Sequence, residues 1–204
     1  MIGIINYGLG NIKAFANIYS RVGIPFLIVS RPDDFKNVTK IILPGVGAFD
    51  HAIQLLEKTG MRESLDNIAM IQRLPILGVC VGMQMMANRS DEGKLRGLQW
   101  IEGEVKKIDS SRLTSATHLP HMGWNSVQPS IKNGLLKDID EASRFYFLHS
   151  YYFECHKSDD VLAITNYGGP FPSVVNFKNI FGVQFHPEKS HQWGIQLLRN
   201  FAAL

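Results

Sequence analysis

The chain has 204 residues, of which 45% are hydrophobic and 19% are charged. This composition is that of an ordinary globular protein and excludes a disordered chain. The 21 Lys and Arg residues and the 18 Asp and Glu residues leave a net charge of +3, and both signs are scattered along the chain. The charge therefore indicates neither a nucleic-acid nor a membrane partner. At this length we expect a single domain over residues 1–204.

The two cysteines and the N-terminus predict a cytoplasmic protein. Cys80 and Cys155 are too few for a disulfide framework, so each thiol needs its own explanation. The N-terminus lacks the basic leader and small-residue cleavage site of a signal peptide. The longest nearly apolar stretch, from Pro75 to Ala87, is shorter than the about 20 residues that a membrane span requires.

The first half of the chain alternates short apolar runs with amphipathic stretches. The apolar runs predict strands, and the spacing of apolar residues between them predicts helices. The expected strands are Ile2–Ile5, Phe26–Val29, Ile41–Leu43 and Ile76–Val79, and the expected helices are Ile12–Val22 and Ala48–Thr59. These strands are apolar throughout, as is typical of a parallel sheet with helices on both faces. The pattern predicts an open α/β sheet.

The second half of the chain is rich in strands joined by short turns. The expected strands are Val105–Ile108, Val127–Pro129, Arg144–Tyr152, Val161–Asn166, Ser173–Phe177 and Ile180–Phe185. Short connections favour antiparallel pairing, so we expect these strands to extend the parallel sheet. A closing helix, Gln192–Ala203, has the apolar spacing of a buried face. The predicted fold class is α/β, with a mostly parallel sheet flanked by helices, a flavodoxin-like core and additional antiparallel strands.

A cysteine elbow is predicted after the strand Ile76–Val79. The pentapeptide Gly78-Val79-Cys80-Val81-Gly82 has glycine two residues to either side of the cysteine, as a tight strand-to-helix turn requires. Such a turn places the Cys80 sulfur at the N-terminus of the next helix, whose dipole and free amides favour the thiolate. The plainer interpretation, a buried structural cysteine, stays open on the pentapeptide alone.

A base for this nucleophile is available far along the chain. The segment Gly182-Val183-Gln184-Phe185-His186-Pro187-Glu188 begins as a strand and breaks at the proline. In an extended chain, residues two apart point the same way, so Glu188 can orient the His186 imidazole toward the thiol. The alternative is that His186 closes a strand and Glu188 is solvated.

The segment Leu43-Pro44-Gly45-Val46-Gly47-Ala48 is a candidate oxyanion loop. Its two glycines allow backbone amides to approach a ligand closely. An amide of Val46 or Gly47, together with that of Val81, could bind a developing negative oxygen. The alternative is a simple turn.

No cofactor or metal site is predicted. The pairs Gly8-x-Gly10 and Gly45-x-Gly47 lack the third glycine of a dinucleotide fingerprint. His118, His121 and His156 fit no zinc-ligand spacing, and two cysteines add little to them.

Together these elements resemble the class I (triad) glutamine amidotransferase family. More narrowly, five segments are similar to the glutaminase subunits of imidazole glycerol phosphate synthases, and the similarity covers essentially the whole chain. The segments are Asn6-Tyr7-Gly8-Leu9-Gly10-Asn11, Pro44-Gly45-Val46-Gly47-Ala48-Phe49, Pro120-His121-Met122-Gly123-Trp124-Asn125, Tyr146-Phe147-Leu148-His149-Ser150-Tyr151 and Gln184-Phe185-His186-Pro187-Glu188-Lys189-Ser190.

The resemblance implies hydrolysis of L-glutamine to L-glutamate and ammonia. Cys80 would attack the side-chain amide to form a thioester, His186 would act as acid and then as base, and Glu188 would orient the imidazole. The residues implied to hold glutamine are Gly45, Gln84, Ser150 and Tyr151, with Val46, Gly47 and Val81 as the oxyanion residues.

The resemblance also implies a heterodimer. The family passes ammonia directly to a (β/α)8-barrel synthase subunit, which forms imidazole glycerol phosphate in histidine biosynthesis. Trp124, Tyr146 and Lys189 match positions that face this partner.

Departures from the family pattern leave the partner open. Val79 and Val81 replace the usual Ile and Leu of the elbow, and Gln99 and Trp100 stand where glycine and a small aliphatic residue are usual. Close relatives of this subunit supply ammonia for the amidation of surface sugars, which is one alternative. A non-catalytic regulatory subunit is a second, against which the intact Cys80, His186 and Glu188 argue. A peptidase of the same fold is a third, against which Gln84 argues.

Overall fold

The computed structural model describes residues 1–113, 117–131 and 134–204. Its largest sheet has eight strands in the order β2-β1-β3-β4-β13-β12-β11-β8. Neighbouring strands from β2 to β13 are parallel, and β12, β11 and β8 continue the sheet with antiparallel pairing. The order β2-β1-β3-β4-β13 is that of a flavodoxin-like sheet. The predicted fold class is therefore confirmed.

Burial along the parallel strands explains their apolar sequences. The strands are β1 (Ile2–Ile5), β2 (Phe26–Val29), β3 (Lys40–Gly45), β4 (Ile76–Cys80) and β13 (Ile180–Val183). Every residue of β1, β4 and β13 is buried, whereas β2, at the edge of the sheet, buries only its last residue. The carboxyl ends of β3, β4 and β13 lie at one edge of the sheet, which is where ligands bind in folds of this kind.

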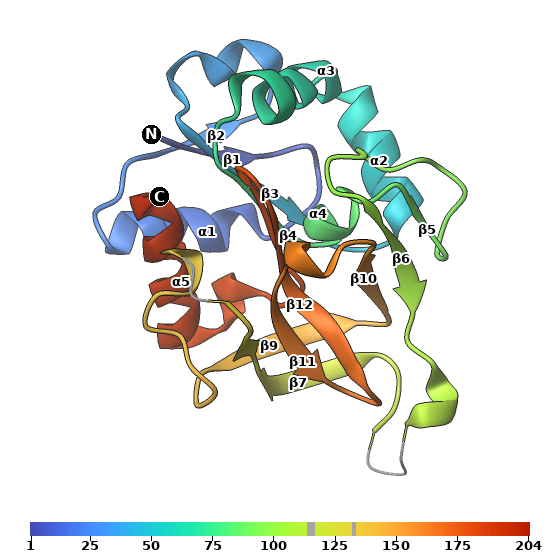
Figure 1. Cartoon of the computed structure of the whole chain (residues 1–204). Helices are drawn as coiled ribbons and strands as arrows, with labels where there is room; N and C mark the ends of the chain where they lie inside the picture. The colour runs from blue at the N-terminus through green and yellow to red at the C-terminus, as the bar shows by residue number, and fades with distance from the viewer. Residues whose placement is uncertain (114–116, 132–133) are drawn as a thin grey trace.

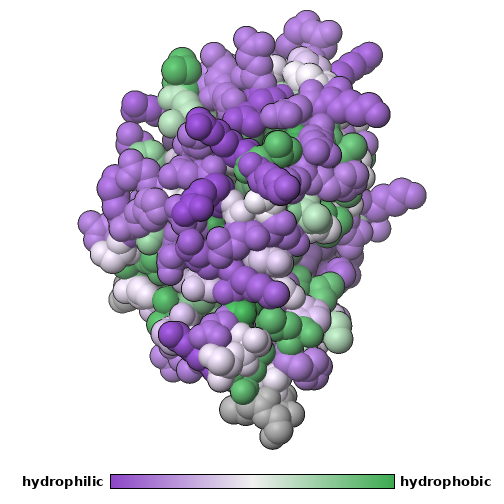
Figure 2. Space-filling view, turned by 90° about the vertical axis from the view of Figure 1, so that its right-hand side faces the viewer, coloured by the Kyte–Doolittle hydropathy of each residue, from purple (hydrophilic) through white to green (hydrophobic). Residues whose placement is uncertain are grey.

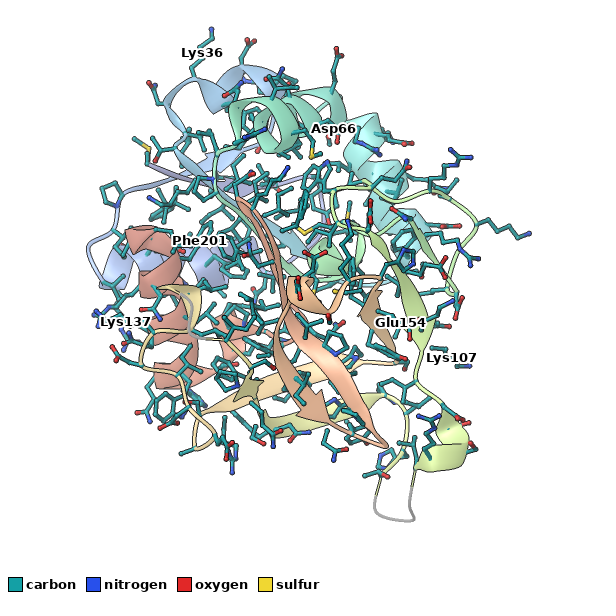
Figure 3. The ribbon with its side chains drawn as sticks, in the orientation of Figure 1. Lys36, Asp66, Lys107, Lys137, Glu154 and Phe201 are labelled. Atoms are coloured by element: carbon teal, nitrogen blue, oxygen red, sulfur yellow. The ribbon has the colours of Figure 1, made fainter. Side chains whose placement is uncertain are left out.

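Helices cover both faces of the sheet. In Figure 1, α1 (Ile12–Arg21) and α5 (His191–Ala203) lie on one side, and α2 (Phe49–Lys58) lies on the other. Phe201 of α5, labelled in Figure 3, is completely buried in the core. The remaining helical segments are α3 (Arg62–Asp66), which continues into the π-helical turn η2 (Asn67–Gln72), α4 (Val81–Gln84), η1 (Pro32–Asn37), η3 (Ser110–Arg112), η4 (Gly134–Leu136), η5 (Ser158–Asp160) and η6 (Pro187–Lys189).

The second half forms two smaller sheets as well as the antiparallel extension. The extension consists of β8 (Gln128–Pro129), β11 (Val161–Asn166) and β12 (Pro170–Phe177). One smaller sheet pairs β7 (His121–Ser126) with β9 (Arg144–His149), and the other has the order β10 (Tyr151–Cys155), β6 (Gly103–Lys107) and β5 (Arg89–Ser90). The prediction that these strands all extend the parallel sheet is therefore wrong in part.

The expected single strand Arg144–Tyr152 is two strands that divide at Ser150. Residues before Ser150 pair with β7, and residues after it pair with β6, so the two halves belong to different sheets. The Ser150 carbonyl accepts a hydrogen bond from the Ile108 amide at 3.0 Å, which joins the dividing residue to the end of β6. The apolar pattern is continuous across this point, and for that reason it gave no sign of a break.

The helix after the elbow is a single turn. Beyond Gln84, the carbonyls of Met85, Met86 and Ala87 accept hydrogen bonds from the amides of residues 98–101 instead of from a continuing helix. Because a helix dipole grows with the number of aligned peptides, four residues supply little of it. The dipole that follows Cys80 is therefore that of a single helical turn.

The molecular surface is mostly polar on one face of the molecule. Figure 2 shows the face that carries α2, β5 and β6 as mainly hydrophilic, with apolar residues in small separate patches. None of the helices in residues 1–113, 117–131 and 134–204 is both long enough and apolar enough to cross a membrane.

Replacing Gly82 with alanine should destabilise the chain. A Cβ at this position would collide with the Leu43 carbonyl and lie 3.1 Å from the Pro44 carbonyl carbon, which are both backbone groups. We expect the free energy of unfolding to fall by about 2 kcal/mol or more, measured by chemical denaturation. In the control Gly134→Ala, the nearest atom is the flexible end of the Leu204 side chain, so the loss should be smaller. Equal losses in the two variants would contradict the steric explanation.

Candidate active site

A cavity of about 300 Å³ lies at the carboxyl edge of the parallel strands. It brings together most of the residues that the sequence singles out, from segments far apart in the chain. Its lining comprises Val46, Gly47, Cys80, Val81, Gln84, Glu92, Pro120, Leu148, His149, Ser150, Tyr151, His186 and Lys189. Gly45 is absent from this lining, because it is buried beneath the turn that follows Cys80.

The Cys80 backbone has the strained conformation of an elbow. Its φ of 54° and ψ of −112° lie outside the regions that non-glycine residues favour. Close packing around the turn requires the flanking glycines: a Cβ on Gly78 would lie 2.6 Å from the Met86 methyl carbon and 2.8 Å from the Gly82 carbonyl oxygen. The side chain of Cys80 is only 4% exposed, and it lines the cavity. The turn therefore directs the sulfur into the cavity.

His186 connects Cys80 with a buried carboxylate. The His186 Nδ1 lies 2.9 Å from the Glu188 Oε1, and the imidazole and the Cys80 side chain line the same cavity. Burial alone would lower the pKa of His186, but the hydrogen bonds and charges of Cys80 and Glu188 outweigh it and raise the pKa to about 10. Since Nδ1 faces the carboxylate, Nε2 is the nitrogen that faces the sulfur. These contacts therefore favour the protonated form of the imidazole.

The glycine-rich loop after β3 forms the opposite wall of the cavity. Val46 and Gly47 line it together with Val81, the first residue after the cysteine. Gly47 has a φ of 86°, which explains the need for glycine there. The arrangement brings all three predicted oxyanion residues to the cavity that holds the sulfur.

Gln84, Ser150 and Tyr151 line the cavity on the side of β10. The Gln84 Nε2 donates a hydrogen bond to the Tyr151 carbonyl at 2.9 Å and another to the Gln184 Oε1 at 3.1 Å. With both amide hydrogens used by the protein, Gln84 can offer a ligand only its carbonyl oxygen, which is an acceptor.

Sequence reasoning missed Glu92, which adds a carboxylate to the cavity lining. Its Oε2 accepts a hydrogen bond from the Phe49 amide at 2.9 Å, which anchors the side chain at the start of α2. No motif marks this residue, because it lies in a connection between β5 and β6 whose path depends on the fold. The Asp50 carboxylate accepts hydrogen bonds from the amides of Lys94 and Leu95 in the same connection, but this contact is evident only in the folded structure.

Two buried histidines form part of the wall behind Tyr151. The His149 Nδ1 lies 2.9 Å from the Tyr151 carbonyl, which can only accept, so this nitrogen carries the proton. The His149 Nε2 is then the acceptor for the His121 Nδ1 at 3.0 Å. The Asn125 amide, 3.3 Å from the His121 Nε2, completes a chain of hydrogen bonds running in one direction. His149 is thus a structural histidine with a hydrogen bond at each ring nitrogen.

Burial keeps both of these imidazoles neutral. Desolvation lowers the pKa of His121 to about 4, and desolvation together with the neighbouring His121 lowers the pKa of His149 to about 3. In the described parts of the chain, residues 1–113, 117–131 and 134–204, neither ring has a carboxylate as its hydrogen-bond partner, in contrast to His186. The neutral forms are also the ones that the hydrogen-bond directions require.

Trp124, Tyr146 and Lys189 form an exposed cluster beside the cavity. The Trp124 ring, 48% exposed, meets the Tyr146 ring edge-on at 6.0 Å between centroids, and it stacks on His191 at 5.1 Å. The Lys189 Nζ lies 5.7 Å from the centre of the Tyr146 ring. Because Lys189 also lines the cavity, this cluster is continuous with the cavity wall. The structure thus brings together the three residues that were predicted to face a partner.

Cys155 has surroundings unlike those of Cys80. Burial, and to a lesser extent the negative charge of Asp160, raises the pKa of its thiol to about 12. It lies at the end of β10, and it is not part of the cavity lining. Among the described ranges 1–113, 117–131 and 134–204, no group of three or more His, Cys, Asp and Glu side chains is arranged to hold a metal ion.

Comparisons with known proteins agree with the geometry. A family model described as glutamine amidotransferase class-I matches residues 4–203. A Bdellovibrio bacteriovorus protein named imidazole glycerol phosphate synthase subunit HisH is 51% identical over 204 residues, with all of both chains covered. A protein of the same name from Leptospira borgpetersenii is 50% identical over the same length, again with complete coverage of both.

Solved structures share the fold at low sequence identity. One described as a glutamine amidotransferase has a TM-score of 0.76 at 16% identity and covers 100% of this chain and 99% of its own. The structure of PurLQS from Thermotoga maritima has a TM-score of 0.71 at 16% identity, covering 98% of this chain and 96% of its own. These two similarities concern the fold alone.

The buried histidine pair predicts a stability loss in mild acid. Below their ordinary value of 6.5, the unfolded chain takes up protons that folded His121 and His149 do not, so stability should fall as the pH drops from 6.5 to 4. In His149→Gln this slope should become shallower by up to about 1.4 kcal/mol per pH unit. Denaturant titrations across this range measure it. His186, whose pKa is raised, affects stability on the alkaline side instead.

A core variant without a titrating group controls for a general loss of stability. Phe201→Leu should lower the whole stability curve in that pH range without changing its slope. Equal slopes in the parent chain and His149→Gln would contradict the assignment of neutral, buried imidazoles.

Proposed function

The chain belongs to the class-I glutamine amidotransferase family and is a glutaminase subunit of imidazole glycerol phosphate synthase, and we propose that Cys80, His186 and Glu188 carry out its reaction. One observation carries this proposal: the His186 imidazole lies between the Cys80 thiol and a buried carboxylate, at the wall of the cavity. This is the arrangement of a nucleophile, a base and an orienting group. The expected single domain is also supported by a family match spanning residues 4–203.

In the first half of the reaction, the Cys80 sulfur attacks the side-chain amide carbon of glutamine. A carbon–sulfur bond forms, and the carbonyl π electrons move to oxygen to give a tetrahedral intermediate. His186 Nε2 then gives its proton to the amide nitrogen, the carbon–nitrogen bond breaks, and ammonia leaves a glutamyl thioester. The raised pKa of His186 means that the proton is already present before the attack.

In the second half, the neutral His186 takes a proton from water. The resulting hydroxide attacks the thioester carbon, and the carbon–sulfur bond breaks with the sulfur again as thiolate. The product leaves as the side-chain carboxylic acid and becomes glutamate when it gives its proton to solvent. Glu188, with its side chain 1% exposed, keeps the Nδ1 proton in place and stabilises the imidazolium that forms. Atoms and charges return to their starting state, so the cycle needs no cofactor.

The oxyanion of both intermediates needs hydrogen-bond donors at the cavity wall. The backbone amides of Gly47 or Val46, together with that of Val81, are the proposed donors, since these residues line the cavity that holds the sulfur. Donors fixed in the backbone cost no reorganisation when the charge develops.

The α-ammonium and α-carboxylate groups of glutamine carry opposite charges, so each requires a partner of the opposite sign. Gln84, Ser150 and Tyr151 are proposed to hold the substrate, and the Glu92 carboxylate is placed to attract its α-ammonium group. The hydrogen bond from Phe49 leaves the other Glu92 oxygen available for a ligand. Gly45 is proposed to act indirectly, since its lack of a side chain allows β3 to approach the elbow.

The partner is proposed to be a (β/α)8-barrel synthase subunit in a heterodimer. The cluster of Trp124, Tyr146 and Lys189 borders the cavity, so a partner docked on it would receive ammonia without release into solution. Direct transfer matters because ammonia in water is mostly protonated and no longer nucleophilic. The names of relatives that are 50–51% identical over their full length favour histidine biosynthesis over surface-sugar amidation.

Mutation of Cys80 tests the reaction. Cys80→Ala should lower glutamine hydrolysis by at least about 10³-fold, measured as glutamate release by the chain mixed with a barrel synthase partner and the ligand of that partner. Labelling by a glutamine-analogue electrophile should disappear in the same variant. Cys155→Ala is the matched control and should keep both activities. Labelling that persists in Cys80→Ala would remove Cys80 from this role, and full activity without any partner would count against the barrel assignment.

Neutralising Glu92 should weaken glutamine binding more than catalysis. We expect Glu92→Gln to raise KM by about tenfold or more with kcat nearly unchanged, because a charge-assisted hydrogen bond to the α-ammonium is lost. The control variant is Glu104→Gln. Glu104 lies on β6, away from the cavity, and pairs with Arg89. An unchanged KM in Glu92→Gln would exclude Glu92 from substrate recognition.

A further inference from the structure

A completely buried amide lies beside the cysteine sulfur and is not part of the proposed catalytic triad. Gln184 follows directly after β13, two residues before His186, and none of its surface is exposed. Its Nε2 lies 3.8 Å from the Cys80 Sγ, and its Oε1 accepts the hydrogen bond from Gln84 at 3.1 Å. The same side chain therefore contacts both the proposed nucleophile and a proposed substrate-binding residue.

The polarity of this amide follows from its neighbours. The Tyr151 carbonyl can only accept, so the Gln84 atom 2.9 Å from it must be the nitrogen. That nitrogen also faces Gln184, and the Gln184 atom that meets it must therefore be oxygen. The remaining end of Gln184, the N–H group, is then directed at the Cys80 sulfur. The Tyr151 carbonyl of β10 thus determines that the sulfur faces the N–H group of Gln184.

A donor at this position fills a role that the fold leaves open. The helix after Cys80 has four residues and offers little dipole to a thiolate. The ionisable side chains that act on Cys80 are His186 and Tyr7, whose hydroxyl donates to the Pro44 carbonyl at 2.8 Å. His186 must give up its proton during the reaction, whereas an amide N–H keeps its own. Within residues 1–113, 117–131 and 134–204, the Gln184 amide is a donor to the sulfur that keeps its proton throughout the reaction.

We propose that Gln184 is a positioning residue, which donates an N–H to the Cys80 sulfur and at the same time orients Gln84 toward glutamine. This inference rests on the proposed glutaminase function for its effect on substrate. Its effect on the sulfur is independent of that function. Two measurable consequences follow: the donor holds the Cys80 sulfur where an electrophile in the cavity can reach it, and the acceptor lowers KM for glutamine.

Two substitutions separate these consequences. Gln184→Glu keeps the length and an oxygen acceptor for Gln84, but it removes the N–H, whereas Gln184→Met removes both groups without adding charge. In the full-length chain at fixed pH, the rate constant for alkylation of Cys80 by iodoacetamide should fall roughly tenfold in both variants. With the barrel subunit present, KM for glutamine should rise several-fold in Gln184→Met and less than about twofold in Gln184→Glu.

Ser173→Ala provides the matched control. Ser173 is as buried as Gln184 and pairs with it through the backbone, but its Oγ has no hydrogen-bond partner within residues 1–113, 117–131 and 134–204. This variant should keep the parent alkylation rate and KM. Thermal unfolding of all three variants identifies one that fails to fold, and the other Gln184 variant then supplies the alkylation result.

The outcomes are distinct. Alkylation within about twofold of the parent rate in a folded Gln184 variant would overturn the donor role, and equal KM changes in Gln184→Glu and Gln184→Met would overturn the orientation of Gln84. If the parent chain hydrolyses no glutamine, the proposed function is refuted. If the Gln184 variants of that chain are nevertheless alkylated more slowly, the proposed contact between Gln184 and the sulfur still holds.

Discussion

The site depends on how closely the end of β3 approaches the turn after β4. Gly45 and Cys80 are neighbours in register, and any side chain on Gly45 or Gly82 would collide with the backbone of the other segment. This contact forces Cys80 into its strained conformation and directs the sulfur away from the core. The strain of about 1–3 kcal/mol that such a conformation stores is held by the packing of two buried strands. Every other component is placed relative to this fixed sulfur.

The parallel pairing of β13 with β4 places the other residues of the site relative to Cys80. Val183 pairs with Val79, so the next residue, Gln184, comes to lie beside Cys80, and His186 follows at the same edge. His186 is held in turn by its amide, which bonds to the Tyr146 carbonyl at 2.8 Å, next to the partner-facing cluster. The Tyr151 carbonyl accepts from both His149 and Gln84, so the chain of hydrogen bonds from Asn125 ends on the atom that also holds Gln84. One strand, β9, contributes to both regions, because Tyr146 belongs to the partner-facing cluster and Leu148 and His149 line the cavity.

Local chemistry in the sequence was enough to predict much of this arrangement. Most strands and helices of the first half lie within two residues of their expected bounds, since each has a continuous apolar pattern and a clear stop. The elbow and the His186 segment were found because their residue types are specific to a task. Glu92 and Gln184 were missed as functional candidates, because a solvated glutamate and a strand glutamine have no distinguishing pattern until the fold places them beside a cavity and a sulfur. The break at Ser150 was missed for a related reason: only the pairing partners of the two halves reveal it.

The three buried histidines show how the fold assigns the proton. His121, His149 and His186 are each at most 6% exposed, so burial disfavours the charged form of all three. His186 differs in having the Glu188 carboxylate and the Cys80 side chain on its two nitrogens, and its pKa rises to about 10, whereas the other two fall to about 4 and about 3. A charge on His149 would need a second acceptor where His121 supplies a donor, so the hydrogen-bond chain itself resists protonation. The imidazoles of His121 and His149 therefore stay neutral because they are buried, whereas the partners of His186 outweigh its burial and favour a proton there.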